Sequence, residues 1–224
     1  MSDVAIDVVA DPERACAERL AAQARAGGSI VLTGGSTPRD AYEIAAELEP
    51  DWSRAEVWWG DERCVPPDDE RSNYGMAKAA LLDRLAVPPA AVHRMRGELG
   101  RDDGAADYER ELGGRVTFDL LLLGLGPDGH MASLFPGSPQ LGVLDRRVTS
   151  GPAGLEPFVD RITLTLPALQ AARRIVFLVL GDSKAWAVRA AFGGDVSHDV
   201  PASLARLAPV PVEVYLDEAA AATL

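Results

Sequence analysis

The segment 121–137 carries the side chains best suited to proton transfer. It reads LLLGLGPDGHMASLFPG, in which an apolar run leads into a glycine-rich turn that holds Asp128 and His130. An imidazole titrates near neutral pH, so His130 could act as a general acid or base. Asp128 could orient the ring or raise its basicity. A lone histidine is more often a hydrogen-bonded structural residue, but the position after a buried strand and beside a carboxylate favours catalysis here.

The same segment matches the pattern G-x-G-x-x-G through Gly124, Gly126 and Gly129. In a dinucleotide-binding fold this pattern follows the first strand, whereas here it follows a late one. Asp128 would also face a pyrophosphate with like charge. We therefore reject a dinucleotide site.

A second candidate is the loop between the apolar run 29–33 and a helix predicted to begin at Pro38. Its glycines allow a sharp turn and a close approach to a ligand, and the free N–H groups of a helix start attract anions. The Lys of a Walker P-loop is missing, so a nucleoside triphosphate is not implied. Thr37 could cap the helix. The structural alternative to a phosphate site is an ordinary tight strand-to-helix turn. The residues of the predicted phosphate-binding turn are Gly34, Gly35, Ser36 and Thr37.

Further charged candidates follow other predicted strands. Asp61 could accept hydrogen bonds from sugar hydroxyls, and Arg63 could bind an anion. The alternative is a solvated acidic loop, which would contain the same types of residue. Arg161 begins the run RITLTL, and Lys184 opens a helix after RIVFLVLGDS. Each of these two cations taken alone is more often a surface charge.

These side chains need a fold that brings distant loops together. Apolar β-like runs alternate with helical patterns, which predicts a doubly wound α/β sheet, mostly parallel and Rossmann-like, with helices on both faces. Ligands bind such sheets at the carboxyl ends of strands, where the candidate loops lie. Helix starts are predicted at Asp11-Pro12 and at Ser72, the second helix running to about residue 85. The predicted strands are 4–9, 29–33, 55–60, 118–124, 161–166, 174–180 and 212–216.

The composition narrows the class of protein. The 224 residues suit a single domain, 1–224, and their formal net charge of −12 argues against a nucleic-acid partner. The amino-terminal segment does not resemble a signal peptide, and no apolar run is long enough for a membrane span. Cys16 is predicted to lie in the core, and neither a disulfide nor a metal site is expected. We expect a cytoplasmic location and no membrane partner; the size favours a monomer and permits a small homo-oligomer.

Taken together, five segments resemble the 6-phosphogluconolactonase family. They cover nearly the whole chain except 86–117 and 138–160, and the ending VPASLARL with VYLDEAA resembles that family's tail. The segments are LTGGSTP (32–38), WGDERCVPPDDERSNYG (59–75), LLLGLGPDGHMASLFPG (121–137), RITLTLP (161–167) and LGDSKA (180–185).

The resemblance implies an enzyme that hydrolyses 6-phosphogluconolactone to 6-phosphogluconate in the oxidative pentose phosphate pathway, without cofactor or metal. It implies that His130 is the general acid/base. It also implies that the turn 34–37, Arg161 and Lys184 hold the phosphate. Arg63 could serve either the oxyanion or the phosphate, and the sequence does not decide between them.

Two positions depart from the family pattern. Met131 replaces the small hydroxyl residue that usually follows the histidine, which removes one hydrogen-bonding group near the base. The segment GLEPFVD before Arg161 lacks the usual proline pair, which weakens the placement of that arginine.

Two other functions compete. A glucosamine-6-phosphate isomerase/deaminase shares the fold and the phosphate turn, but it carries a glutamate soon after the Asp-Gly-His turn, and no acidic residue occurs here between His130 and Asp145. A non-catalytic sugar-phosphate sensor would need no titrating base, so the intact Asp128-Gly129-His130 turn argues against it.

Overall fold

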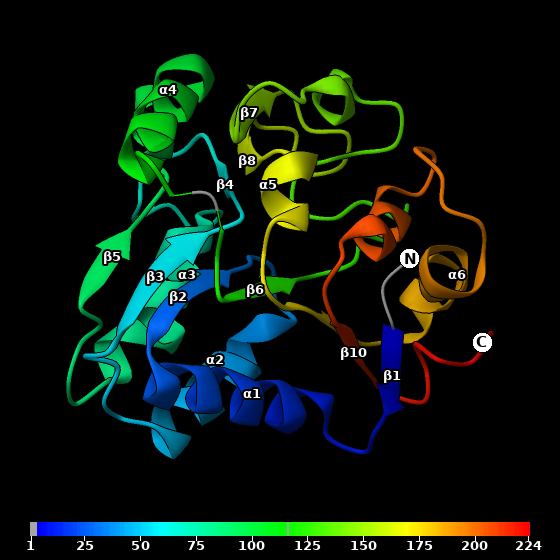
Figure 1. The fold of residues 1–224 in the computed structure, drawn as a ribbon, viewed down its shortest axis with the longest axis horizontal. Coiled ribbons are helices and arrows are strands. Elements are labelled where there is room, and N and C mark those ends of the chain that lie inside the picture. Colours follow the sequence, from blue (N-terminus) through cyan, green and yellow to red (C-terminus); the bar gives the residue numbers. More distant parts are fainter. Residues whose placement is uncertain (1–3, 116) are drawn as a thin grey trace.

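Within residues 4–115 and 117–224, which are those the computed structural model describes, the chain forms a parallel sheet of seven strands and an antiparallel sheet of three (Figure 1). The large sheet has the order β1-β10-β9-β6-β2-β3-β5, and the small one has the order β4-β8-β7. The strands are β1 (Val4–Val8), β2 (Gly28–Leu32), β3 (Ala55–Trp59), β4 (Asp61–Arg63), β5 (Ala91–His93), β6 (Leu120–Leu123), β7 (Val148–Gly151), β8 (Arg161–Leu164), β9 (Ile175–Val179) and β10 (Val212–Leu216).

Helices flank the large sheet, with α1 and α2 on one side of it and α5 and α6 on the other in Figure 1. No helix in the described part of the chain has both the length and the apolar character needed to cross a membrane. The α-helices are α1 (Pro12–Ala26), α2 (Pro38–Leu48), α3 (Asn73–Ala80), α4 (Arg101–Leu112), α5 (Leu166–Gln170) and α6 (Ala185–Val188).

The predicted α/β class is confirmed, and strands form at all seven predicted positions. Strand β8 forms where expected, but it pairs in the small antiparallel sheet rather than in the large one. All four of its residues are buried, which is also the burial pattern of a strand inside a parallel sheet. The sequence does not predict β4, β5 and β7, each only three or four residues long.

Local capping explains where two helices begin. The Asp11 carboxylate accepts a hydrogen bond from the Arg14 N–H at 2.9 Å, and the Ser72 hydroxyl accepts one from the Gly75 N–H at 3.0 Å. Both starts agree with the sequence prediction. The helix after Ser72 is shorter than predicted, because it ends at Ala80 and a 3₁₀ turn follows.

The order of the large sheet reverses between β2 and β6. From β2 the chain builds outward through β3 to β5, and from β6 it builds in the opposite direction through β9 and β10. The two strands pair only at Ile30 with Leu120 and Val31 with Leu121. Beyond these pairs a crevice can open at the carboxyl ends, which is where ligands bind in folds of this class.

Two buried tyrosines satisfy the backbone near the strand ends. The Tyr42 hydroxyl accepts a hydrogen bond from the Thr33 N–H at 2.9 Å and donates one to the Thr33 carbonyl at 2.8 Å. The Tyr108 hydroxyl does the same for Trp59, at 2.9 and 3.1 Å. Burial raises the pKa of both tyrosines, so the hydroxyls stay neutral and can donate.

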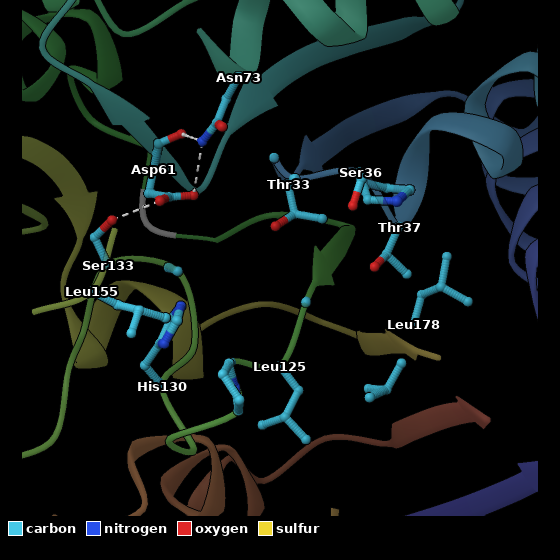
Figure 2. Close-up of a pocket in the computed structure, with 18 of the residues that line it drawn as sticks. Thr33, Ser36, Thr37, Asp61, Asn73, Leu125, His130, Ser133, Leu155 and Leu178 are labelled. Atoms are coloured by element: carbon cyan, nitrogen blue, oxygen red, sulfur yellow. Dashed lines mark hydrogen bonds between the residues drawn. The ribbon is translucent and has the colours of Figure 1, made fainter. Parts of the chain in front are cut away.

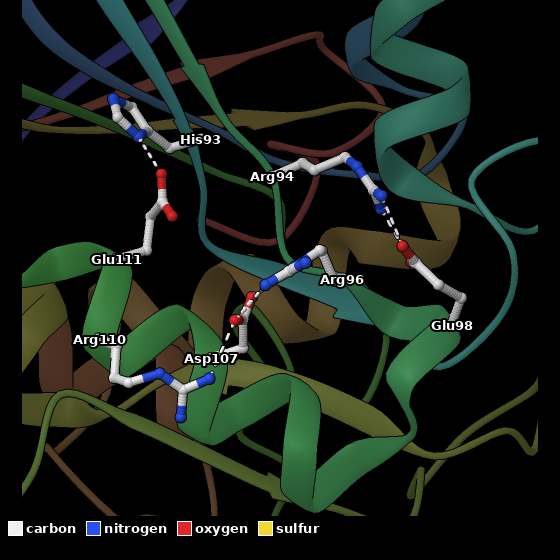
Figure 3. Close-up of polar contacts among 7 residues, drawn as sticks. All are labelled: His93, Arg94, Arg96, Glu98, Asp107, Arg110 and Glu111. Atoms are coloured by element: carbon white, nitrogen blue, oxygen red, sulfur yellow. Dashed lines mark hydrogen bonds and ion pairs between the residues drawn. The ribbon is translucent and has the colours of Figure 1, made fainter.

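Ion pairs connect α4 to the strand at the sheet edge (Figure 3). His93 Nδ1, at the end of β5, lies 2.7 Å from Glu111 Oε1, and Arg96 forms a bidentate pair with Asp107. These contacts hold α4 next to β5 and the loop after it, and Tyr108 of α4 reaches the backbone of Trp59 at the end of β3.

We predict that Tyr42→Phe lowers the free energy of unfolding by about 1–3 kcal/mol, because the N–H and carbonyl of Thr33 lose their partner. Chemical denaturation followed by circular dichroism measures the change. Tyr74→Phe is the control, since the Tyr74 hydroxyl makes no hydrogen bond to the described residues; equal losses in the two variants would contradict this account.

Candidate active site

The turn after β6 holds His130 against Asp128. His130 Nδ1 lies 2.5 Å from Asp128 Oδ1, and the Phe135 ring lies 4.6 Å from the imidazole, centroid to centroid. Partial burial raises the pKa of Asp128, but the hydrogen bond and charge of His130 outweigh this and the net shift is downward. The carboxylate therefore accepts the Nδ1 proton, which leaves the basic lone pair on Nε2.

Gly126 allows this arrangement. A Cβ at Gly126 would lie 1.9 Å from His130 Nδ1 and 2.5 Å from Asp128 Oδ1. The Gly126 N–H also donates to the His130 carbonyl at 2.9 Å and closes the turn. Gly126 thus makes room for the histidine and carboxylate pair.

The loop between β2 and α2 turns at Gly35, whose φ is +94°. Helix α2 begins at Pro38 as predicted, but the Thr37 side chain makes no capping hydrogen bond, so the predicted cap is wrong. Thr37 already has helical backbone angles (φ −56°, ψ −46°), and its side chain lines the pocket together with Ser36 (Figure 2).

Two arginines lie side by side where β4 pairs with β8. Arg63 and Arg161 are register partners, and Arg161 is only 4% exposed. Arg161 Nη2 donates to the Pro157 carbonyl at 2.9 Å, while its Nε and Nη1 and the Nε of Arg63 are buried without a partner. Burial, and then the charge of Arg63, lowers the pKa of Arg161. Unpaired guanidinium donors in a pocket indicate a site for an anion.

Lys184 approaches the same pocket from the other side of the sheet reversal, in the 3₁₀ turn Asp182–Lys184 after β9. Burial lowers the pKa of its ammonium group, and the charge of Asp128 opposes that shift. The pocket wall thus holds three cationic side chains, although the net charge of the chain is −12.

One pocket of about 270 Å³ brings together the candidate residues (Figure 2). Asp128 is not part of the pocket wall and contacts it through His130. The candidate residues in the wall are Gly34, Gly35, Ser36, Thr37, Asp61, Arg63, His130, Arg161 and Lys184.

The pocket wall also includes residues that sequence reasoning missed, among them Asn73, Ser133, Leu155 and Glu156. Asn73 stands in a polar loop beside a predicted cap, a pattern that surface loops share. Met131, by contrast, is fully buried and does not line the pocket, so its departure from the family pattern does not remove a group from the wall.

Comparisons with known proteins agree on one family. The family model "Glucosamine-6-phosphate isomerases/6-phosphogluconolactonase" matches residues 2–212. A 6-phosphogluconolactonase of Mycobacterium leprae is 41% identical over 223 residues, covering 91% of this chain and 88% of that protein. One from Synechocystis is 44% identical over 169 residues, covering 71% and 69%. The solved structure of a 6-phosphogluconolactonase from Thermotoga maritima superposes with a TM-score of 0.86 at 29% identity, covering 96% of this chain and 100% of that one.

We predict that Gly126→Ala displaces the His130 ring and lowers the free energy of unfolding by about 1–3 kcal/mol, because the added methyl has no space. Nuclear magnetic resonance should show the loss of the downfield Nδ1 proton that His130 shares with Asp128. Gly142→Ala is the control, since a Cβ there meets no atom within 4 Å. A Gly126→Ala variant that keeps the proton signal would show that the turn tolerates a side chain.

Proposed function

The chain belongs to the family of glucosamine-6-phosphate isomerases and 6-phosphogluconolactonases, and from this membership we propose that it hydrolyses 6-phospho-D-glucono-1,5-lactone to 6-phospho-D-gluconate. The observation that carries the proposal is the pairing of a histidine base with unpaired cationic donors in one pocket. A phosphorylated lactone has both a carbonyl open to water and an anion at the far end.

In the proposed mechanism His130 Nε2 takes a proton from the attacking water, and the oxygen of that water bonds to the lactone carbonyl carbon. The tetrahedral oxyanion collapses, the bond from that carbon to the ring oxygen breaks, and His130 returns the proton to that oxygen. Asp128 keeps Nδ1 protonated and stabilises the imidazolium that forms between these steps. The product is then a carboxylic acid, which loses its proton to water at neutral pH and gives 6-phosphogluconate.

Phosphate binding is assigned to the turn 34–37, Arg161 and Lys184. Support comes from the hydroxyl-bearing Ser36 and Thr37 in the pocket wall at the start of α2 and from the unpaired donors of Arg161. Of the two roles open to Arg63, phosphate binding is the better supported, because Arg63 and Arg161 are register partners. Binding the remote phosphate would hold the carbonyl near His130.

The decisive experiment is a pH-stat assay on fresh 6-phosphogluconolactone, with spontaneous hydrolysis subtracted. We expect kcat/KM to exceed that for unphosphorylated gluconolactone on the order of 100-fold, since each charged hydrogen bond to the phosphate contributes about 1.5–3 kcal/mol. His130→Ala should lower kcat by roughly 10²–10⁴-fold. Equal rates on the two lactones would refute the proposed phosphate site. Unchanged turnover by His130→Ala would refute the role of His130 as general base. Ammonia release from glucosamine 6-phosphate would favour a glucosamine-6-phosphate isomerase instead.

Asp128→Asn should lower kcat by roughly 10²–10⁴-fold with a small change in KM, because an amide can present its N–H to Nδ1 and favour the wrong tautomer. Steady-state kinetics at several pH values measure this. Asp145→Asn is the matched control, since Asp145 is an exposed aspartate whose ion pair is with its neighbour Arg146. A loss confined to KM would assign Asp128 to substrate binding instead.

A further inference from the structure

A buried chain of hydrogen bonds runs from the start of α3 to the turn that carries His130. Glu62 accepts hydrogen bonds from the backbone N–H groups of Asn73 and Tyr74, at 2.7 and 2.8 Å, and from the Ser72 hydroxyl at 3.0 Å. These contacts anchor the first turn of α3 without using the Asn73 side chain. The structural needs of this helix start are therefore met by Glu62 and by the Ser72 cap.

Among the described residues, the Asn73 side chain makes hydrogen bonds only to Asp61. Its Nδ2 donates to the Asp61 carbonyl at 2.9 Å and to Asp61 Oδ1 at 3.3 Å (Figure 2). The opposite orientation of the amide would point its oxygen at two acceptors, so the contacts determine which atom is nitrogen. Asn73 is 1% exposed, which makes this a buried and specific contact.

The amide oxygen of Asn73 lies against the predicted phosphate-binding turn. It is buried without a hydrogen-bond partner, and a Cβ at Gly34 would lie 1.8 Å from it. Leaving a buried acceptor unpaired costs free energy. A side chain selected for stability alone would not be expected to carry this cost, since the helix start is already capped.

Asp61 is held at both oxygens by neutral groups. Ser133, three residues after His130, donates from its hydroxyl to Asp61 Oδ2 at 2.6 Å, opposite the Asn73 contact on Oδ1. Each carboxylate oxygen can accept more than one hydrogen bond, so Asp61 keeps capacity for substrate hydroxyls.

We propose that Asn73 is a positioning residue, which orients the Asp61 carboxylate while its amide packs on Gly34 and so sets the spacing between Asp61 and the phosphate-binding turn. This inference rests on the proposed function, because it assigns Asp61 to the hydroxyls of a phosphorylated sugar. The substrate is then held at two points on one rigid unit, with the phosphate at the turn and the ring hydroxyls at Asp61.

The test is a double-mutant cycle on the full-length protein. Asn73→Ala should lower kcat/KM for 6-phosphogluconolactone about 10–100-fold, as loss of a supporting partner typically does. In an Asp61→Ala background, Asn73→Ala should lower kcat/KM by less than about threefold, because the carboxylate that Asn73 orients is gone. Equal losses in both backgrounds would overturn the proposal.

Gln140→Ala is the matched control for removing a buried amide. Gln140 is 8% exposed, donates to the Ser150 carbonyl at 2.9 Å and lies outside the pocket. Its loss should affect the thermal midpoint but leave kcat/KM within about twofold in either background. If Gln140→Ala lowers kcat/KM in the unmodified protein but not in the Asp61→Ala background, the coupling to Asp61 is general rather than specific to Asn73.

Asn73→Asp gives a readout that a purely structural role would not move. The new carboxylate faces Asp61 with like charge at neutral pH and can donate a hydrogen bond only when protonated. Activity relative to the unmodified protein should therefore rise as the pH falls. A ratio that stays constant with pH would contradict the positioning role.

The same double-mutant cycle can be measured on binding, since calorimetry gives the affinity of each variant for 6-phosphogluconate without turnover. If the protein binds 6-phosphogluconate but does not hydrolyse the lactone, the proposed function alone is contradicted. The affinities of the single and double variants then decide whether Asn73 acts through Asp61. A protein that neither binds nor turns over contradicts both proposals.

Discussion

The structure depends on the separation of two adjacent parallel strands. β2 and β6 share only two residue pairs, and their connections then leave in opposite directions. Backbone groups at such a divergence lose their sheet partners, and buried polar groups need a substitute. Tyr42, from α2, supplies it at Thr33 with a single hydroxyl that both donates and accepts. The crevice at the carboxyl ends can therefore stay open, with the turn 34–37 on one side and the turn of His130 on the other.

Electrostatics then decide what such a crevice can hold. The chain has a net charge of −12, so long-range attraction does not bring an anion to it. The pocket compensates at short range, where Arg161 and Arg63 present unpaired donors and Lys184 is partly buried. Burial and the neighbouring Arg63 lower the pKa of Arg161, and the carboxylates of Asp61 and Glu62 offset this only in part. The arrangement suits a ligand with a concentrated negative charge, such as a phosphate.

The side chains of the pocket are positioned by contacts that do not themselves take part in the proposed reaction. The buried carboxylate of Glu62 anchors the start of α3; burial raises its pKa, while the three backbone N–H groups and the Ser72 hydroxyl that donate to it act in the opposite direction. Through Asn73 this anchor connects to Asp61, and Ser133 connects Asp61 to the His130 turn. Groups from strand β4, from the start of α3 and from the loop after β6 are thus placed by one hydrogen-bonded network, which limits their relative movement.

The sequence by itself determined the fold class, seven strand positions and the loops that line the pocket, because each of these depends on local patterns: apolar runs, helix caps and glycines at strand ends. His130 and Asp128 were identifiable for the same reason, since they are two residues apart. Only the tertiary structure decided that β8 pairs with β4, that Arg161 therefore lies beside Arg63, and that Asn73 reaches both Asp61 and Gly34. These contacts join residues far apart in the chain, and a local pattern carries no information about which distant strand or loop a side chain will meet.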